Sequence, residues 1–132
     1  MKKILIIEDN IEIRENTAEL LELSNYKVIV ASNGNSGFYL AKNDSPDLIL
    51  CDLMMPETDG REFLKLAKED SVVCDIPLIF FSAGSLFPDV IKELVKASTG
   101  YLQKPFSEEE LLTTIKNGLD KRIINTPVIH NA

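Results

Sequence analysis

The chain has 132 residues, of which 45% are hydrophobic, and a formal charge of −7 at pH 7. This size and composition are typical of one compact, soluble globular domain. The acidic balance argues against nucleic acid as a direct partner, because phosphate backbones are bound by clustered lysine and arginine side chains. The apolar run at residues 4–7 is far shorter than a signal-peptide core or a membrane span, so we expect a cytoplasmic protein with no membrane contact.

Short β-branched runs alternate along the chain with longer segments of helical period. This pattern predicts repeated strand and helix units around a parallel sheet. In chain order, we predict a strand at 3–7, a helix at 11–23, a strand at 27–31, a helix at 35–42, a strand at 47–51, a helix at about 61–69, a strand at 78–81, a helix at 87–97, a strand at 100–103 and a helix from 107 to about 121.

Local signals support several of these elements. Asn10 is the predicted N-cap of the first helix. The unbroken apolar run at residues 48–50 suits a central strand that is covered on both faces. Ser107, with Glu110 three residues later, forms a capping-box pattern, which indicates that the last helix begins there.

Five strands that alternate with five helices predict an α/β fold. The expected architecture is a flavodoxin-like, doubly wound parallel sheet of strand order 2-1-3-4-5. We expect this domain to cover residues 1–121. Residues 122–132 contain Pro127 and show no helical period, so they are predicted to form a C-terminal tail or the stub of a linker.

Polar side chains stand at the carboxyl ends of the predicted strands, where such sheets place their ligand sites. They are Glu8 and Asp9, Asp52, Ser82 and Lys104. Each has an ordinary structural role when taken alone. Acidic residues at a helix start interact favourably with the helix dipole, a strand-end hydroxyl can bond to the backbone, and a lysine can simply lie at the surface.

Taken together, these side chains predict phosphoryl-transfer chemistry. If the first and third strands are neighbours, Glu8, Asp9 and Asp52 crowd together and raise one another's pKa values unless a cation offsets them. Mg²⁺ suits such a site, because it binds one or two carboxylates and takes phosphate oxygens as further ligands. Asp52 would then be the nucleophile towards phosphorus, with Lys104 and Ser82 contacting the equatorial oxygens.

Other chemistries find little support in the sequence. There is no P-loop motif, no G-x-G-x-x-G after the first strand, and no calcium-loop pattern after Asp52. The single histidine, His130, lies in the predicted tail, so a Ser/His or Cys/His nucleophile pair is not credible. Cys51 and Cys74 lack metal-ligand spacing and are expected to be reduced, structural thiols.

The chain resembles the receiver domains of two-component response regulators over about residues 1–121. The motifs that carry the resemblance are Ile-Leu-Ile-Ile-Glu-Asp-Asn near the start, Pro-Asp-Leu-Ile-Leu-Cys-Asp52-Leu-Met-Met-Pro with Asp59-Gly60 behind it, Ser82-Ala83, and Gly-Tyr101-Leu-Gln-Lys104-Pro-Phe. The resemblance implies that Asp52 accepts a phosphoryl group from a histidine kinase or a histidine phosphotransfer protein. It also implies that Glu8, Asp9, Asp52 and the backbone carbonyl of Met54 hold Mg²⁺.

The resemblance further implies a switch. Lys104 would contact the phosphoryl group, and the bond from Lys104 to Pro105 would be cis. Ser82 and Tyr101 match the hydroxyl and aromatic positions that move together on phosphorylation, although an aromatic ring on a short edge strand can also simply cover the sheet. The switch would change the face of the fourth helix, fifth strand and fifth helix, which would bind a downstream protein; a phosphorylation-dependent homodimer stays open.

Two positions depart from the common receiver pattern, namely Thr58, where Met is frequent, and Ser82, where Thr is commoner. Neither change removes a needed functional group. Met54 and Gly84 occupy the positions that tune phosphoryl lifetime, and neither offers a carboxylate or amide to guide water. We therefore expect slow self-dephosphorylation.

Two rival hypotheses remain beside that of a signalling phosphoacceptor that is not itself an enzyme. One is a small-molecule phosphatase with an aspartate nucleophile, but such enzymes usually need a second Asp two residues on, where this chain has Met54. The other is a degenerate receiver that acts as a fixed interaction module. The intact set of polar strand-end residues argues against it.

Overall fold

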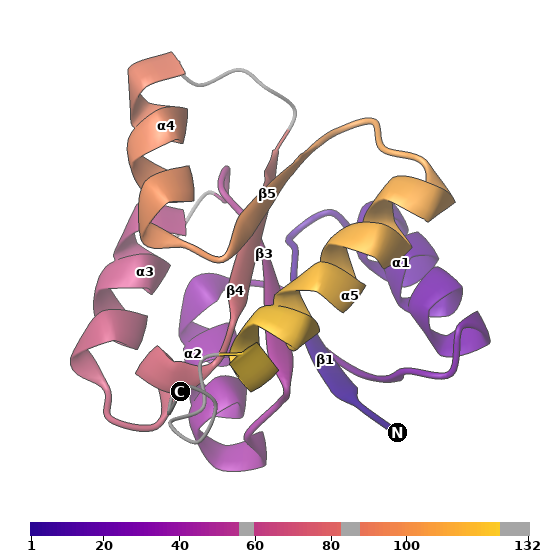
Figure 1. Cartoon of the computed structure of the whole chain (residues 1–132), viewed down its shortest axis with the longest axis horizontal. Coiled ribbons are helices and arrows are strands. Elements are labelled where there is room, and N and C mark those ends of the chain that lie inside the picture. The colour runs from indigo at the N-terminus through magenta and orange to yellow at the C-terminus, as the bar shows by residue number, and fades with distance from the viewer. Residues whose placement is uncertain (56–59, 83–87, 125–132) are drawn as a thin grey trace.

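The computed structural model describes residues 1–55, 60–82 and 88–124 (Figure 1). The elements are β1 (Lys3–Ile7), α1 (Ile11–Leu23), β2 (Lys27–Ala31), α2 (Gly34–Asp44), β3 (Leu48–Asp52), α3 (Gly60–Glu69), a 3₁₀ turn η1 (Val73–Asp75), β4 (Leu78–Ser82), α4 (Pro88–Ala97), β5 (Gly100–Gln103) and α5 (Glu108–Ile124).

The strands form one five-stranded sheet of order β2-β1-β3-β4-β5, and every neighbouring pair is parallel. The predicted α/β, flavodoxin-like architecture is therefore confirmed. Every residue of β3 and β4 is buried, as expected for central strands covered on both faces. The strand order reverses between β1 and β3, and in such sheets a ligand crevice lies beside that point.

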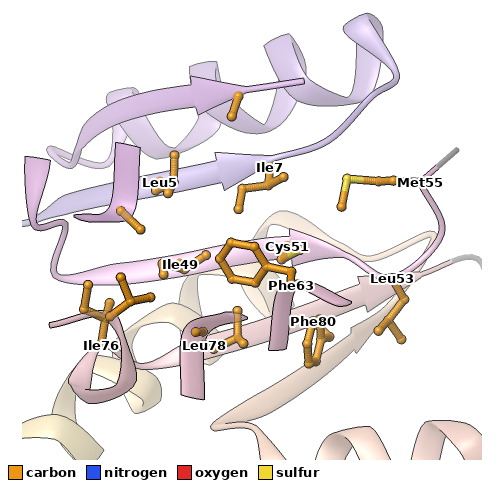
Figure 2. Close-up of a cluster of buried hydrophobic side chains, with 14 of the residues drawn as sticks. Leu5, Ile7, Ile49, Cys51, Leu53, Met55, Phe63, Ile76, Leu78 and Phe80 are labelled. Carbon is orange, nitrogen blue, oxygen red and sulfur yellow. The ribbon is translucent and has the colours of Figure 1, made fainter. Parts of the chain in front are cut away.

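Helices cover both faces of the sheet, with α1 and α5 on one face and α2, α3 and α4 on the other (Figure 1). Because successive strand residues point to opposite faces, β1 contributes Leu5 and Ile7 to one core and Ile4 and Ile6 to the other. Figure 2 shows the first core, in which Phe63 of α3 lies among side chains of the central strands. The two cores fix the sheet and, with it, the positions of the strand ends.

The predicted helix caps are present. The side chain of Asn10 accepts a 3.0 Å hydrogen bond from the backbone N–H of Ile13. Ser107 and Glu110 exchange two bonds of 3.0 Å, each side chain accepting from the backbone N–H of the other residue. Both caps lie at the carboxyl edge of the sheet and thereby fix where the chain enters α1 and α5.

Several element boundaries differ from the sequence-based expectation by one to three residues. β3 and β4 each run one residue further than predicted, so Asp52 and Ser82 are the last residues of their strands. α5 continues to Ile124, so the domain boundary predicted after residue 121 falls inside this helix. In the sequence, Asn125 directly follows Ile124 and Pro127 comes two residues later, and both residue types are common just past a helix end. Residues 125–132, with His130, lie outside the described residues.

Within the described ranges, no helix combines the length and the apolar character that crossing a membrane requires.

Candidate functional site

Three carboxylates meet at the carboxyl edge of the sheet. Glu8 and Asp9 follow β1, and Asp52 ends the adjacent strand β3. One carboxylate oxygen from each residue lies within 4.8 Å of the others. Glu8 and Asp52 are 1% and 4% exposed, whereas Asp9 is exposed at the mouth of the cluster. The predicted acidic cluster is thus assembled, with two of its members almost fully removed from solvent.

Lys104 reaches this cluster from the segment after β5. Its ammonium nitrogen lies 2.7 Å from Glu8 Oε1 and 3.6 Å from Asp52 Oδ2. Its backbone N–H donates to the carbonyl oxygen of Ser82 at 2.7 Å, which extends the pairing of β4 with β5. The bond from Lys104 to Pro105 is cis, as the resemblance implied. One ammonium group therefore faces three carboxylates, and its shortest contact is with Glu8.

Asp9 shows the electrostatic consequence of this crowding. Burial raises the pKa of its carboxyl group, and the hydrogen bond and negative charge of Glu8 raise it further. The charge of Lys104 acts in the opposite direction but is a smaller influence. The cluster therefore disfavours ionisation of Asp9, and a divalent cation bound there would offset this effect.

The donor chemistry of the cluster fits Mg²⁺. Carboxylate oxygens are the ligands that this hard cation prefers, and the ion keeps positions for water and phosphate oxygens. The backbone N–H of Met54 donates to Asp52 Oδ1 at 3.0 Å, which orients the Asp52 carboxylate. The assignment of the Met54 carbonyl as a further ligand stays a prediction.

Ser82 and Tyr101 lie together on β4 and β5. The Ser82 hydroxyl is 3.3 Å from the Tyr101 hydroxyl, within hydrogen-bonding distance. Ser82 is fully buried, and the Tyr101 ring is partly buried against the core. The two predicted switch residues are therefore in direct contact. Thr58 and Gly84, the other two positions noted in the sequence, lie outside the described residues.

The two cysteines are both free, as expected. Cys51 is buried and Cys74 is exposed. The Cys51 thiol donates to the carbonyl oxygen of Asp52 at 3.4 Å. Cys51 thus packs directly behind the acidic cluster without offering a ligand to it.

Sequence reasoning missed one residue of this site. Arg14, the fourth residue of α1, donates from Nη1 to the backbone carbonyl oxygen of Glu8 at 2.9 Å. An arginine in the first turn after the Asn10 cap was the available signal, because a long side chain there can reach back to the strand end. The periodicity of α1 alone does not distinguish this position from an ordinary solvent-facing one.

The fold and the acidic cluster define the class of receiver-type signalling domains. The chain matches the family "Response regulator receiver domain" over residues 4–116. It is 36% identical over 115 residues to the phosphate regulon transcriptional regulatory protein PhoB of Pseudomonas aeruginosa, covering 87% of this chain and 50% of that protein. It is 32% identical over 130 residues to the probable transcriptional regulator ycf29 of Pyropia yezoensis, covering 98% of this chain and 59% of that protein.

Solved structures of response regulators have the same fold as this chain. The chemotaxis response regulator CheY4 of Vibrio cholerae superposes with a TM-score of 0.81 at 31% identity, covering 89% of this chain and 98% of that one. The chain belongs to the response regulator receiver family and is a module of two-component signal transduction rather than a conventional enzyme. It spans about half to three-fifths of the length of the two curated relatives described above.

Proposed function

We propose that this chain is the phosphoacceptor of a two-component phosphorelay and that Asp52 receives the phosphoryl group from a histidine kinase or a histidine phosphotransfer protein. The observation that carries the proposal is the cluster of Glu8, Asp9 and Asp52 within 4.8 Å, with Lys104 against it. Residues 1–121 are the proposed receiver unit, acting in the cytoplasm, and residues from 122 onward are the proposed tail or linker.

The residues of the cluster have separate roles in this proposal. The Asp52 carboxylate attacks phosphorus while the bond from phosphorus to the histidine nitrogen breaks, and the histidine leaves with its electron pair. Glu8, Asp9, Asp52 and the Met54 carbonyl would hold Mg²⁺, which supplies positive charge to the phosphoryl oxygens when it is bound. Lys104 supplies a second positive charge, and the Ser82 hydroxyl supplies a hydrogen bond.

The contact between Ser82 and Tyr101 supports a signalling role for the same site. A phosphoryl oxygen that binds the Ser82 hydroxyl competes with the 3.3 Å contact to Tyr101. The Tyr101 ring then repacks, and the face of α4, β5 and α5 changes in population. That face is the proposed binding surface for a downstream protein or for a second copy of the chain.

The exposed, apolar side chain of Met54 supports slow self-dephosphorylation, since it offers no group to orient an attacking water. The same residue argues against the phosphatase alternative, because it replaces the acid/base Asp that those enzymes place two residues beyond the nucleophile. The degenerate-receiver alternative requires a site that has lost its chemistry. Here Glu8, Asp9 and Asp52 lie within 4.8 Å of one another, and Lys104 pairs with Glu8 and Asp52.

Incubation with Mg²⁺ and acetyl phosphate, followed by intact-mass measurement, tests the proposal. We expect the gain of one hydroxylamine-labile phosphoryl group, dependent on Mg²⁺ and absent in Asp52→Asn. A wild-type chain that gains no mass would support the degenerate receiver. Turnover of acetyl phosphate without an accumulated phosphoprotein would support the phosphatase.

A further inference from the structure

The turn that carries Glu8 and Asp9 is held by several hydrogen bonds. The backbone N–H of Glu8 donates to the carbonyl oxygen of Ala31 in β2 at 3.0 Å. The backbone N–H of Asn10 donates to Glu8 Oε2 at 3.1 Å. The backbone N–H of Arg14 donates to the carbonyl oxygen of Asn10 at 2.9 Å, which opens α1. These bonds hold the two ends of the turn.

The side chain of Arg14 binds the middle of this turn. Its 2.9 Å bond goes to the carbonyl of the peptide group that joins Glu8 to Asp9, and it therefore fixes how the backbone between the two carboxylates is oriented. The guanidinium is partly buried and offers a planar, positively charged set of N–H donors. Such a charged donor on a carbonyl is among the stronger hydrogen bonds in proteins.

Arg14 and Lys104 approach the same cluster in different ways. The Lys104 ammonium contacts carboxylate oxygens of Glu8 and Asp52 directly, and those oxygens are the ones that a metal ion needs. The Arg14 bond uses a backbone carbonyl and leaves the carboxylate oxygens to other partners. The Arg14 contact is therefore compatible with a bound divalent cation, whereas the Lys104 contact with Glu8 competes with one.

We propose that Arg14 is a positioning residue for the divalent-cation site, holding the acidic turn in the arrangement that Mg²⁺ binds. The inference rests on the proposed function, because it assumes that the cluster takes Mg²⁺. It goes further in assigning a role to a residue on α1 whose bond to the acidic turn goes to a backbone carbonyl oxygen. Groups that orient metal ligands from outside the coordination shell commonly change affinity by about 10- to 100-fold when they are removed.

The proposal makes a prediction of definite sign. If Arg14 acted only through its positive charge, its removal would make the cluster more negative and would strengthen Mg²⁺ binding. If Arg14 positions the turn, its removal weakens Mg²⁺ binding in spite of that gain in negative charge. A single comparison of affinities therefore separates the two effects.

Titration calorimetry with MgCl₂ on the 132-residue chain provides the test. We expect Arg14→Met to bind Mg²⁺ roughly tenfold more weakly than wild type, and Arg14→Lys, which keeps the charge but loses the planar fork, roughly threefold more weakly. The matched control is Arg61→Met, which makes the same change at an exposed position at the start of α3. Its affinity should stay within about twofold of wild type.

The outcomes separate this inference from the proposed function. A wild-type chain that does not bind Mg²⁺ would overturn both. If wild type binds but Arg14→Met binds equally well or more tightly, the positioning role is wrong and the proposed function stands. Should Arg14→Met fail to fold, as judged by circular dichroism, Arg14→Lys decides the matter, since an affinity equal to that of wild type contradicts the proposal.

Discussion

The two edges of the sheet differ in how much negative charge their polar side chains bring together. At the amino edge, such side chains bind the backbone. Asp47 accepts a 2.8 Å bond from the N–H of Lys3, and the Thr99 hydroxyl accepts a 3.1 Å bond from the N–H of Leu78. At the carboxyl edge, three carboxylates face one another and one ammonium group. These amino-edge side chains are paired with backbone N–H groups, whereas the carboxyl edge concentrates negative charge.

Two aspartates, one near each edge, have pKa values shifted in opposite directions. Asp70, which follows α3 near the amino edge, accepts bonds from the N–H groups of Val73 and Val72, and these lower its pKa. Asp9, at the carboxyl edge, has its pKa raised by burial and by Glu8. The same type of side chain therefore stabilises the fold at one edge and destabilises it at the other. Unfavourable charge of this kind marks the edge where chemistry is expected.

The largest effect on stability is expected for Lys104→Met, measured in the absence of Mg²⁺. It leaves Glu8, which is 1% exposed, without its cation, and should lower the free energy of unfolding by about 2–3 kcal/mol. Saturating Mg²⁺ should recover much of this loss, because the ion offsets the same carboxylate. Urea unfolding with and without Mg²⁺ provides the measurement, with Lys104→Arg as the charge-preserving control. An equal loss under both conditions would show that the lysine contributes mainly by packing.

An intermediate effect is expected for Asp47→Ala at the opposite edge. Removing the acceptor for the Lys3 N–H should cost about 1.5 kcal/mol, as is usual for a hydrogen bond to a charged group. Unlike that of Lys104→Met, this loss should not change with Mg²⁺. Asp47→Asn, which keeps an acceptor oxygen, is the control in the same unfolding measurement. A response of Asp47→Ala to Mg²⁺ would mean that the two edges are coupled.

Asp70→Asn should have a smaller effect that depends on pH. Because the folded pKa of Asp70 is lowered, its ionised form stabilises the fold above the ordinary value of 3.8, and this contribution is lost as pH falls through the folded pKa. The melting temperature of Asp70→Asn should therefore lie below that of wild type at neutral pH, and the two should converge in acid. Thermal melts across this range measure the convergence. A pH-independent difference would assign the effect to packing.

The smallest effect, and one of opposite sign, is expected for Asp9→Asn. The raised pKa means that ionised Asp9 destabilises the metal-free fold at neutral pH, and that this destabilisation disappears as pH falls below 3.8. Because the side chain is exposed and solvent screens its charge, the gain in stability should be only roughly 0.5 kcal/mol. Parallel urea titrations at neutral and acid pH test this. A loss of stability at neutral pH would contradict the account of this edge.

The architecture was predictable because each strand is marked by a short apolar run in the local sequence. The run at Leu48–Asp52 is apolar until its final residue, so the position of Asp52 at a strand end followed from the sequence. The same reasoning placed Glu8, Asp9 and Ser82 at one edge. Parallel strands bring their carboxyl ends together, and no knowledge of individual side-chain contacts was needed for that step.

The side-chain contacts within the site were harder to predict from the sequence. Lys104 was expected to contact a phosphoryl group, and in the structure its shortest contact is with Glu8, at 2.7 Å. The bond from Arg14 to the Glu8 carbonyl was not predicted either. Both depend on how long, flexible side chains settle among several nearby acceptors. Hydrophobic periodicity carries no information about that choice.

The contact between Glu8 and Lys104 joins residues that are 96 positions apart along the chain. A nascent polypeptide that has emerged only as far as β4 already holds every acidic member of the cluster but lacks the lysine that offsets them. Under the proposed function, the site is therefore complete only once β5 has joined the sheet and brought Lys104 to the acidic cluster.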